Sequence, residues 1–176
     1  MPQSRIPAQV KFPFWARVAF ALLAFGTAVT AKACGQVAII VDSSIVRPLD
    51  HLAHDSVEHV ACLFGSTSPD TMFLNTYVIP PQAPVGRTGA YSDDRACLTA
   101  LAHFHTHVVP KDSTATDYLY YSTTDQHSFT HVLQTQLGIV GVPGIWCFWT
   151  RLQINEAWTQ HLTPLWPHPS QCIKLP

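Results

Sequence analysis

Histidines alternate with other residues along one short segment of the sequence, Ala102-His103-Phe104-His105-Thr106-His107. On a β-strand, side chains two residues apart point to the same face, with their Cα atoms about 6.5–7 Å apart. Two imidazoles at that spacing can bind one zinc ion, because each zinc–nitrogen bond is about 2.0–2.1 Å long. His105 and His107 are therefore candidate metal ligands, whereas His103 is interpreted as a surface or core histidine. A His-x-His pattern alone is equally typical of an exposed strand face.

Two carboxylates and a serine elsewhere in the chain could complete such a site. Asp125 lies directly before a helical pattern, where its carboxylate suits a third zinc ligand, and Ser122 lies one helical turn earlier. Upstream, Glu58 interrupts the apolar residues 57–64 and is one of only two glutamates in the sequence. Because glutamate is rarely buried without a partner, Glu58 is a candidate for chemistry. The alternative is a carboxylate at a strand end or a sheet edge.

The hydrophobic pattern around these residues predicts strands interleaved with a few helices. The expected strands are residues 37–41, 57–64, 72–79, 102–109, 139–142 and 145–152. The expected helices are residues 45–54, 93–101 and a third after Asp125, in which Phe129, Val132, Leu133 and Leu137 share one face and Gly138 ends the helix. Residues 82–87 and 110–124 are expected to be loops. This order of elements indicates an α/β (α+β) domain with a mixed sheet.

The composition favours one compact domain. The 176 residues are 47% hydrophobic and 12% charged, which suits a single core. The formal net charge is −1, and without residues 1–33 six Lys and Arg remain against eleven Asp and Glu, a net charge of −5. Such a chain carries no basic field for nucleic acid. The five cysteines form no C-x-x-C pair, so one or two disulfides and a leftover thiol are expected rather than a four-cysteine zinc site.

Residues 1–33 are typical of a secretory signal peptide. Basic residues precede an apolar run, residues 18–31, which as a helix would span about 21 Å, less than the ~30 Å hydrocarbon core of a bilayer. Ala31-Lys32-Ala33 then has the small-x-small pattern of a cleavage site. The sequence therefore predicts an exported protein, periplasmic or secreted, and the alternative is an uncleaved segment that anchors it in the membrane. Cys34 follows the cleavage site, but the residues before it make a poor lipidation signal.

The order of the candidate residues resembles the signature of the JAMM/JAB (MPN-type) zinc metalloproteases. That signature is a glutamate, then H-[ST]-H, then S-x-x-D, and here it is matched by Glu58, His105-Thr106-His107 and Ser122-Thr-Thr-Asp125. Neighbouring segments are also similar. Residues 58–65 resemble the family's glutamate-bearing strand running into a glycine, residues 73–80 its next strand, and residues 102–107 its histidine strand. The similarity covers residues 37–149 of what looks like a bacterial-type member, and the proline-rich tail lies outside it.

Two features depart from the family pattern. Val108 stands where the family commonly has proline after the second histidine, and the interval from His107 to Asp125 is longer than usual. Residues 108–121 would then form an enlarged loop beside the site, and such loops usually shape substrate access.

A second aspartate is the alternative third ligand. Asp117 lies closer to the family's usual interval and has Thr114 three residues before it. Asp125 is preferred because Ser122 precedes it and a hydrophobic helical pattern follows it directly.

The resemblance implies a single JAB/MPN-like domain, residues 34–160, with a mixed curved sheet flanked by helices and an irregular tail, residues 161–176. It further implies a zinc metallopeptidase or isopeptidase that hydrolyses a peptide or protein substrate with a metal-activated water. His105, His107 and Asp125 would bind Zn²⁺, Glu58 would be the general base, and Ser122 would donate to the oxyanion. Two alternatives are an inactive MPN-type scaffold and a periplasmic metal-binding protein.

Overall fold

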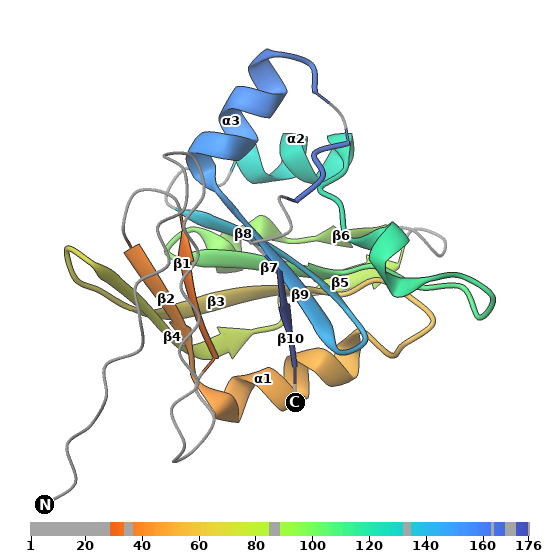
Figure 1. Cartoon of the computed structure of the whole chain (residues 1–176), viewed down its shortest axis with the longest axis horizontal. Coiled ribbons are helices and arrows are strands. Elements are labelled where there is room, and N and C mark those ends of the chain that lie inside the picture. Colours follow the sequence, from red (N-terminus) through yellow and green to blue (C-terminus); the bar gives the residue numbers. More distant parts are fainter. Residues whose placement is uncertain are drawn as a thin grey trace, which may run out of the picture.

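The computed structural model describes residues 29–33, 37–84, 89–131, 135–162, 164–167 and 172–175. One sheet of eight strands runs through the molecule (Figure 1). Its strands, in spatial order, are β1 (Val29–Ala33), β2 (Val37–Val41), β4 (Thr71–Val78), β3 (Val60–Thr67), β7 (Ala102–Thr106), β8 (Leu137–Val142), β9 (Ile145–Thr150) and β10 (Cys172–Lys174). The pairs β2–β4 and β7–β8 are parallel and the others antiparallel. The prediction of an α+β domain with a mixed, curled sheet is confirmed.

Helices cover the two faces of this sheet (Figure 1). Helix α1 (Ser43–Leu52) packs on one face, where its residues Ile45 and Leu49 join a core that includes Phe104 and Trp146. Helices α2 (Thr123–His131) and α3 (Arg151–Thr159) cover the other face through a second core. That second core includes Tyr121, Phe129, Val140, Trp149 and Ile154. Because side chains alternate along a strand, Phe104 of β7 faces α1 while His103 and His105 face α2.

Several elements of the first half form as the sequence predicts. Strand β2 has its expected range, and β4 is displaced from its expected range by one residue. Helix α1 begins two residues before its expected start, capped by Asp42, whose carboxylate accepts a hydrogen bond from the Ser44 N–H at 2.8 Å. Residues 82–87, expected to be a loop, instead contribute β5 (Gln82–Pro84), which pairs with β6 (Ala90–Ser92) in a small second sheet. The helix expected at 93–101 is only a short 3₁₀ turn, η1 (Asp94–Cys97).

Strand β3 begins later than its apolar pattern suggests. It starts at Val60, so Glu58 lies just before the strand and not within it. The strand also continues through Gly65, with a bulge in its pairing with β4. A Cβ at this position would lie 1.7 Å from the Phe73 carbonyl oxygen, so the close approach of the two strands requires glycine here. Strand β7 ends at Thr106, earlier than the expected Val109.

The helix predicted after Asp125 is too long. Helix α2 ends at His131, and Leu137 and Gly138 belong to β8, so the prediction that Gly138 ends the helix is wrong. Leu137 is buried because it pairs with Ala102 and Thr150 across the sheet. Residues Val132 and Leu133 lie outside the described part of the chain. The apparent helical face therefore combined apolar residues from two different elements.

The end of the chain contains two elements that the sequence patterns did not reveal. Residues 151 and 152, expected to end a strand, begin α3, which is capped by reciprocal hydrogen bonds between Thr150 and Gln153. In the tail, β10 pairs with β9.

Two disulfides fall within the range expected from the cysteine count. Cys62 of β3 is bonded to Cys97 of η1, and Cys147 of β9 is bonded to Cys172 of β10. Cys34 and residues 1–28 of the predicted signal peptide lie outside the described residues, while residues 29–33 form β1. None of the helices described in the structure has the length and apolar character needed to span a bilayer.

Candidate metal centre

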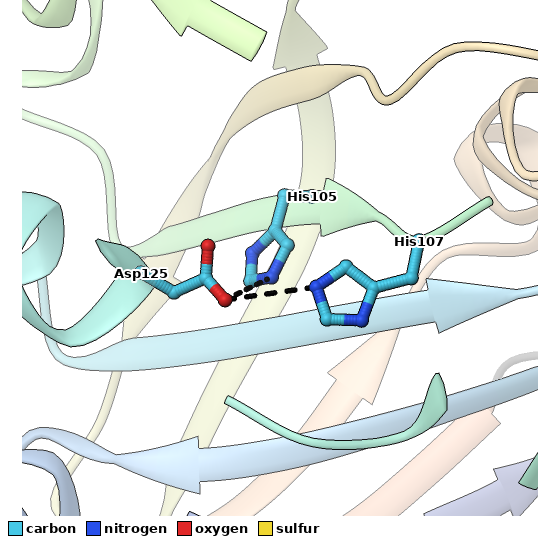
Figure 2. Close-up of side chains that lie close together, drawn as sticks. All are labelled: His105, His107 and Asp125. Atoms are coloured by element: carbon cyan, nitrogen blue, oxygen red, sulfur yellow. Dashed lines mark ion pairs between the residues drawn. The ribbon is translucent and has the colours of Figure 1, made fainter. Parts of the chain in front are cut away.

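Three side chains converge on the α2 face of the sheet: His105, His107 and Asp125 (Figure 2). Their candidate ligand atoms all lie within 4.8 Å of one another. The Asp125 Oδ2 atom is 3.3 Å from His105 Nε2 and 3.6 Å from His107 Nε2. Both imidazoles are buried, while 18% of the Asp125 side-chain surface remains exposed. The group is therefore closed on the sheet side and borders solvent on the carboxylate side.

Strand β7 fixes the two imidazoles because it lies inside the sheet. His105 pairs with Val60 of β3 on one side and with Val140 of β8 on the other. His107 lies one residue beyond the strand, and its backbone N–H donates to the Gly141 carbonyl at 3.0 Å. Neighbouring strands on both sides thus hold the backbone that carries both ligands.

The start of α2 fixes the carboxylate. The backbone N–H of Ser122 donates to Asp125 Oδ2 at 2.8 Å, and the backbone N–H of Asp125 donates to Ser122 Oγ at 3.2 Å. This reciprocal pair has the form of a capping box, which satisfies backbone donors at a helix start. Because Asp125 is part of the cap, its side chain is oriented by the same interactions that begin the helix.

A backbone carbonyl orients His107. The His107 Nδ1 atom lies 2.7 Å from the Tyr118 carbonyl oxygen, at the end of the short turn η2 (Ala115–Tyr118). A carbonyl only accepts, so Nδ1 carries a proton. In the neutral ring Nε2 then has the free lone pair and could bind a metal, whereas in the protonated ring Nε2 donates toward Asp125. Metal-binding histidines usually make this kind of outer hydrogen bond, which fixes the tautomer of the ring.

The charges in this group stabilise one another. Burial acts to raise the pKa of Asp125, but His105 and His107 outweigh it and hold the pKa of this carboxyl well below its usual range. Burial also acts to lower the pKa of His107, but the hydrogen bond and charge of Asp125, together with the charge of Glu58, raise it above its usual value. An ionised aspartate beside two imidazoles is the charge state that a cation would bind.

The donor set fits a metal ion. His105 Nε2 and Nδ1 are buried and have no hydrogen-bond partner among the described residues, although Asp125 lies 3.3 Å from Nε2. A buried polar atom without a partner is costly unless something else satisfies it. For zinc–ligand bonds of about 2.0–2.1 Å in a tetrahedron, two ligand atoms would be about 3.4 Å apart. The 3.3 Å and 3.6 Å separations match this spacing, so the group could hold a metal ion.

Glu58 is held beside the two histidines, even though it lies outside β3. The next residue, His59, receives a hydrogen bond at its carbonyl from the Thr106 N–H and donates its own N–H to Thr106 Oγ1, both at 2.9 Å. Extending the β3–β7 register places Glu58 opposite His107. Burial raises the pKa of Glu58, partly offset by the charges of His107 and His105. Glu58 is therefore half-buried and electrostatically coupled to the group formed by His105, His107 and Asp125.

The other candidates occupy different surroundings. Asp117 is exposed and does not belong to the group formed by His105, His107 and Asp125. His103 is buried, and burial, together with the charge of His105, lowers its pKa to about 4, so this ring is neutral. It is a core histidine with its ring 6.2 Å from that of His105.

Sequence reasoning missed the aromatic residues that surround the group. The ring of Tyr121 packs edge-on against His105 at 5.2 Å between centroids, and the ring of Tyr120 packs against His107 at 4.9 Å. The segment Tyr118-Leu-Tyr-Tyr121 also supplies the carbonyl that orients His107. The sequence did offer one indication of these residues, namely three tyrosines within four positions directly before Ser122. Their spacing, however, fits neither a helix nor a strand, so it predicts no regular element that would place them at the site.

Comparison of the sequence with protein-family models and with curated proteins finds no match. The site is therefore interpreted from its own geometry.

Proposed function

We propose that this protein is an exported, zinc-dependent metallopeptidase or isopeptidase of the JAMM/JAB kind, acting on a peptide or protein substrate. The observation that carries the proposal is the convergence of His105, His107 and Asp125, with Glu58 held beside them. Two imidazoles and one carboxylate are a ligand set typical of catalytic zinc. Among the described residues no fourth His, Cys, Asp or Glu joins the group, and three protein ligands are characteristic of catalytic rather than structural zinc sites.

Zinc bound at this group would act as a Lewis acid and make a water molecule acidic enough to lose a proton near neutral pH. The protein would supply the proton acceptor. Glu58 is half-buried, coupled to both histidines and not one of the ligands, so it is placed to take that proton and deliver it to the leaving amine. Its raised pKa favours this exchange, because a base works best when its pKa is near the working pH.

Ser122 would stabilise the negative charge that develops on the substrate oxygen. Its Oγ accepts a hydrogen bond from the Asp125 N–H, which leaves the hydroxyl proton available for donation. Loss of one such donor typically costs a factor of about 100–1,000 in kcat.

The cysteine chemistry supports an exported protein. Two disulfides in the described part of the chain are typical of an oxidising compartment, such as the periplasm or the extracellular space.

The test combines metal analysis with peptide cleavage. We expect the purified protein to contain about one zinc per chain and to cleave members of a peptide library, with activity removed by chelator and restored by zinc. Glu58→Gln should keep the zinc and lose cleavage, because it removes only the proton acceptor. Full zinc with no cleavage of any peptide by the unmodified protein would instead indicate an inactive scaffold or a metal-binding protein.

The two aspartates give a matched pair of variants. Asp125→Ala should lose zinc, whereas Asp117→Ala, which removes the same group from an exposed position, should keep it. Loss of zinc from Asp117→Ala alone would overturn the assignment of the third ligand.

A further inference from the structure

A hollow lies between α3 and the chain segment that follows it, near the candidate metal centre. It has a volume of about 260 Å³, and residues that line it include Trp149, Glu156, Leu162, Leu165 and Trp166. Pockets that hold whole small molecules are larger, roughly 300–1,000 Å³. This hollow, called the α3 pocket below, has the size for a single side chain.

Aromatic rings connect the α3 pocket to the metal ligands along two lines. Trp166 packs on Tyr120 at 5.2 Å between ring centroids, and Tyr120 packs on His107 at 4.9 Å. Trp149 likewise packs on Tyr121 at 5.3 Å, and Tyr121 packs on His105 at 5.2 Å. Each tryptophan of the pocket is thus separated from one histidine by a single tyrosine. Tyr121 and Trp149 are fully buried, whereas Tyr120 is partly exposed and Trp166 is exposed. A peptide bound at the candidate metal centre could therefore extend over Tyr120 and Trp166 and place a neighbouring side chain in the pocket.

The segment that closes the α3 pocket is held against the start of α2. Leu165 and Tyr121 exchange two backbone hydrogen bonds, of 2.8 and 2.9 Å. The buried amide of Gln126 in α2 donates to the Leu162 carbonyl at 3.3 Å. In Figure 1 the chain after α3 turns back toward α2. The pocket wall and the Asp125 ligand are therefore supported by the same stretch of chain.

The chemistry of the lining selects a basic side chain. The lining residues include no Lys, Arg or His, and their one charged group is the carboxylate of Glu156. Within the described part of the chain, this carboxylate has no ion pair. The rest of the lining consists of two glutamines, an alanine, two leucines and two tryptophans. The leucines and tryptophans suit an aliphatic stem, and tryptophan attracts cations through its ring face.

We propose that the α3 pocket binds the side chain of a lysine or arginine of the substrate, close to the bond that is cleaved. This rests on the proposed peptidase function for its role, although the binding itself can be measured separately. The stem would lie against Leu162 and Leu165, and the cationic end would lie near Glu156 and Trp166.

Small probes test the binding directly. The probes are Nα-acetyl-lysine methylamide, its arginine equivalent, the neutral isostere Nα-acetyl-norleucine methylamide, and N-acetylglucosamine. They would be titrated into protein carrying Glu58→Gln, with the indole N–H resonances of the tryptophans followed by NMR. We expect the lysine and arginine probes to bind roughly 2- to 10-fold more tightly than norleucine, from one exposed ion pair and one cation–π contact. Equal binding of norleucine, or tighter binding of the sugar, would overturn the proposal.

Matched pairs of variants test whether the preference for the lysine probe arises in the α3 pocket. Glu156→Gln should reduce the preference for lysine over norleucine by roughly 2- to 5-fold, whereas Asp112→Asn removes an equal charge from an exposed loop and should leave it unchanged. Trp166→Ala should weaken lysine binding, whereas Trp158→Ala changes a tryptophan of α3 that packs on His127 instead, and should not. A preference that survives both Glu156→Gln and Trp166→Ala would place the binding elsewhere.

Cleavage assays combined with the probe titrations distinguish a failure of the pocket proposal from a failure of the proposed peptidase function. If the lysine probe binds and no peptide is cleaved, the peptidase proposal fails and the pocket assignment stands. If peptides are cleaved at equal rates with lysine or norleucine at every position, and the probes do not discriminate, the pocket assignment fails and the peptidase proposal stands.

Discussion

The metal centre and the α3 pocket lie one tyrosine apart but are built in different ways. The ligands of the metal centre come from an inner strand and a helix cap, and both imidazoles are buried. The α3 pocket has a buried floor that includes Trp149, and its outer wall is formed by exposed residues, among them Leu162 at 53% and Trp166 at 54% exposure. Bond-making chemistry requires fixed geometry, whereas recognition of a flexible basic side chain does not. If the proposed function and the proposed pocket are both right, the sheet sets the chemistry and the outer segment sets the selectivity.

The largest effect that separates the two regions is expected from His105→Ala. Removing this ligand should reduce bound zinc to background and cleavage by more than about 100-fold, since loss of an outer-shell partner alone typically costs 10–100-fold. Binding of the lysine probe should be unchanged, because the α3 pocket does not include His105. His51→Ala, which changes an exposed histidine of α1, is the control. Stoichiometric zinc in His105→Ala, measured by elemental analysis, would contradict the assignment.

The second-largest effect is expected from removing the Cys147–Cys172 disulfide, which joins β10 near the end of the chain to β9. Replacing both Cys147 and Cys172 by serine should lower the free energy of unfolding by about 2–4 kcal/mol. It should also weaken the preference for the lysine probe, because β10, which this disulfide ties to β9, follows the segment that closes the α3 pocket by only a few residues in the sequence. The matched pair Cys62→Ser with Cys97→Ser removes the other disulfide and should cost similar stability without changing probe binding. Denaturant unfolding and the NMR titration measure both quantities, and an equal loss of probe binding in both double variants would contradict the comparison.

A substitution at Gly138 tests how far the two regions depend on Tyr121, whose ring lies between His105 of the candidate metal centre and Trp149 of the α3 pocket. A Cβ at Gly138 would lie 2.7 Å from the Tyr121 hydroxyl oxygen and 2.8 Å from two of its ring carbons. Gly138→Ala should therefore force the ring to shift and lower the free energy of unfolding by about 1–3 kcal/mol, typical of overpacking. Because this ring contacts both His105 and Trp149, zinc affinity and probe binding should both fall. A stable variant with both properties intact would show that the two regions do not depend on this ring.

The elements that could be predicted from the sequence are those whose structure is determined by residues within a single short segment. Strand β2 is a β-branched run, and α1 has its own cap and apolar face. The candidate ligands were accessible for the same reason, since His-x-His on a strand and Ser-x-x-Asp at a helix start are local patterns. The structure brings His105, His107 and Asp125 together as those patterns suggest.

The remaining features depend on contacts between distant segments. By its spacing from Phe129, Leu137 is predicted to lie in the last turn of a helix, but in the structure it belongs to β8 and pairs with Ala102. The carbonyl of Tyr118 carries no side-chain signal, because any residue could supply it. The tail contacts the site region through backbone bonds between Leu165 and Tyr121, the Gln126–Leu162 hydrogen bond and the packing of Trp166 on Tyr120, and no spacing rule predicts these contacts. Long-range pairing of this kind is set by tertiary packing, which overrides local patterns.

The smallest effect is expected from Tyr121→Phe, which keeps the shared ring and removes only its hydroxyl. That hydroxyl is fully buried and has no hydrogen-bond partner among the residues the structure describes. Because a buried hydroxyl without a partner has a desolvation cost, removing it should leave the free energy of unfolding unchanged or raise it by about 1 kcal/mol. Zinc content and the lysine preference should stay as they are, since the ring contacts with His105 and Trp149 remain. A loss of both zinc affinity and stability would instead show that the hydroxyl supports the candidate metal centre. The two regions would then be connected through the hydroxyl of Tyr121 as well as through its ring.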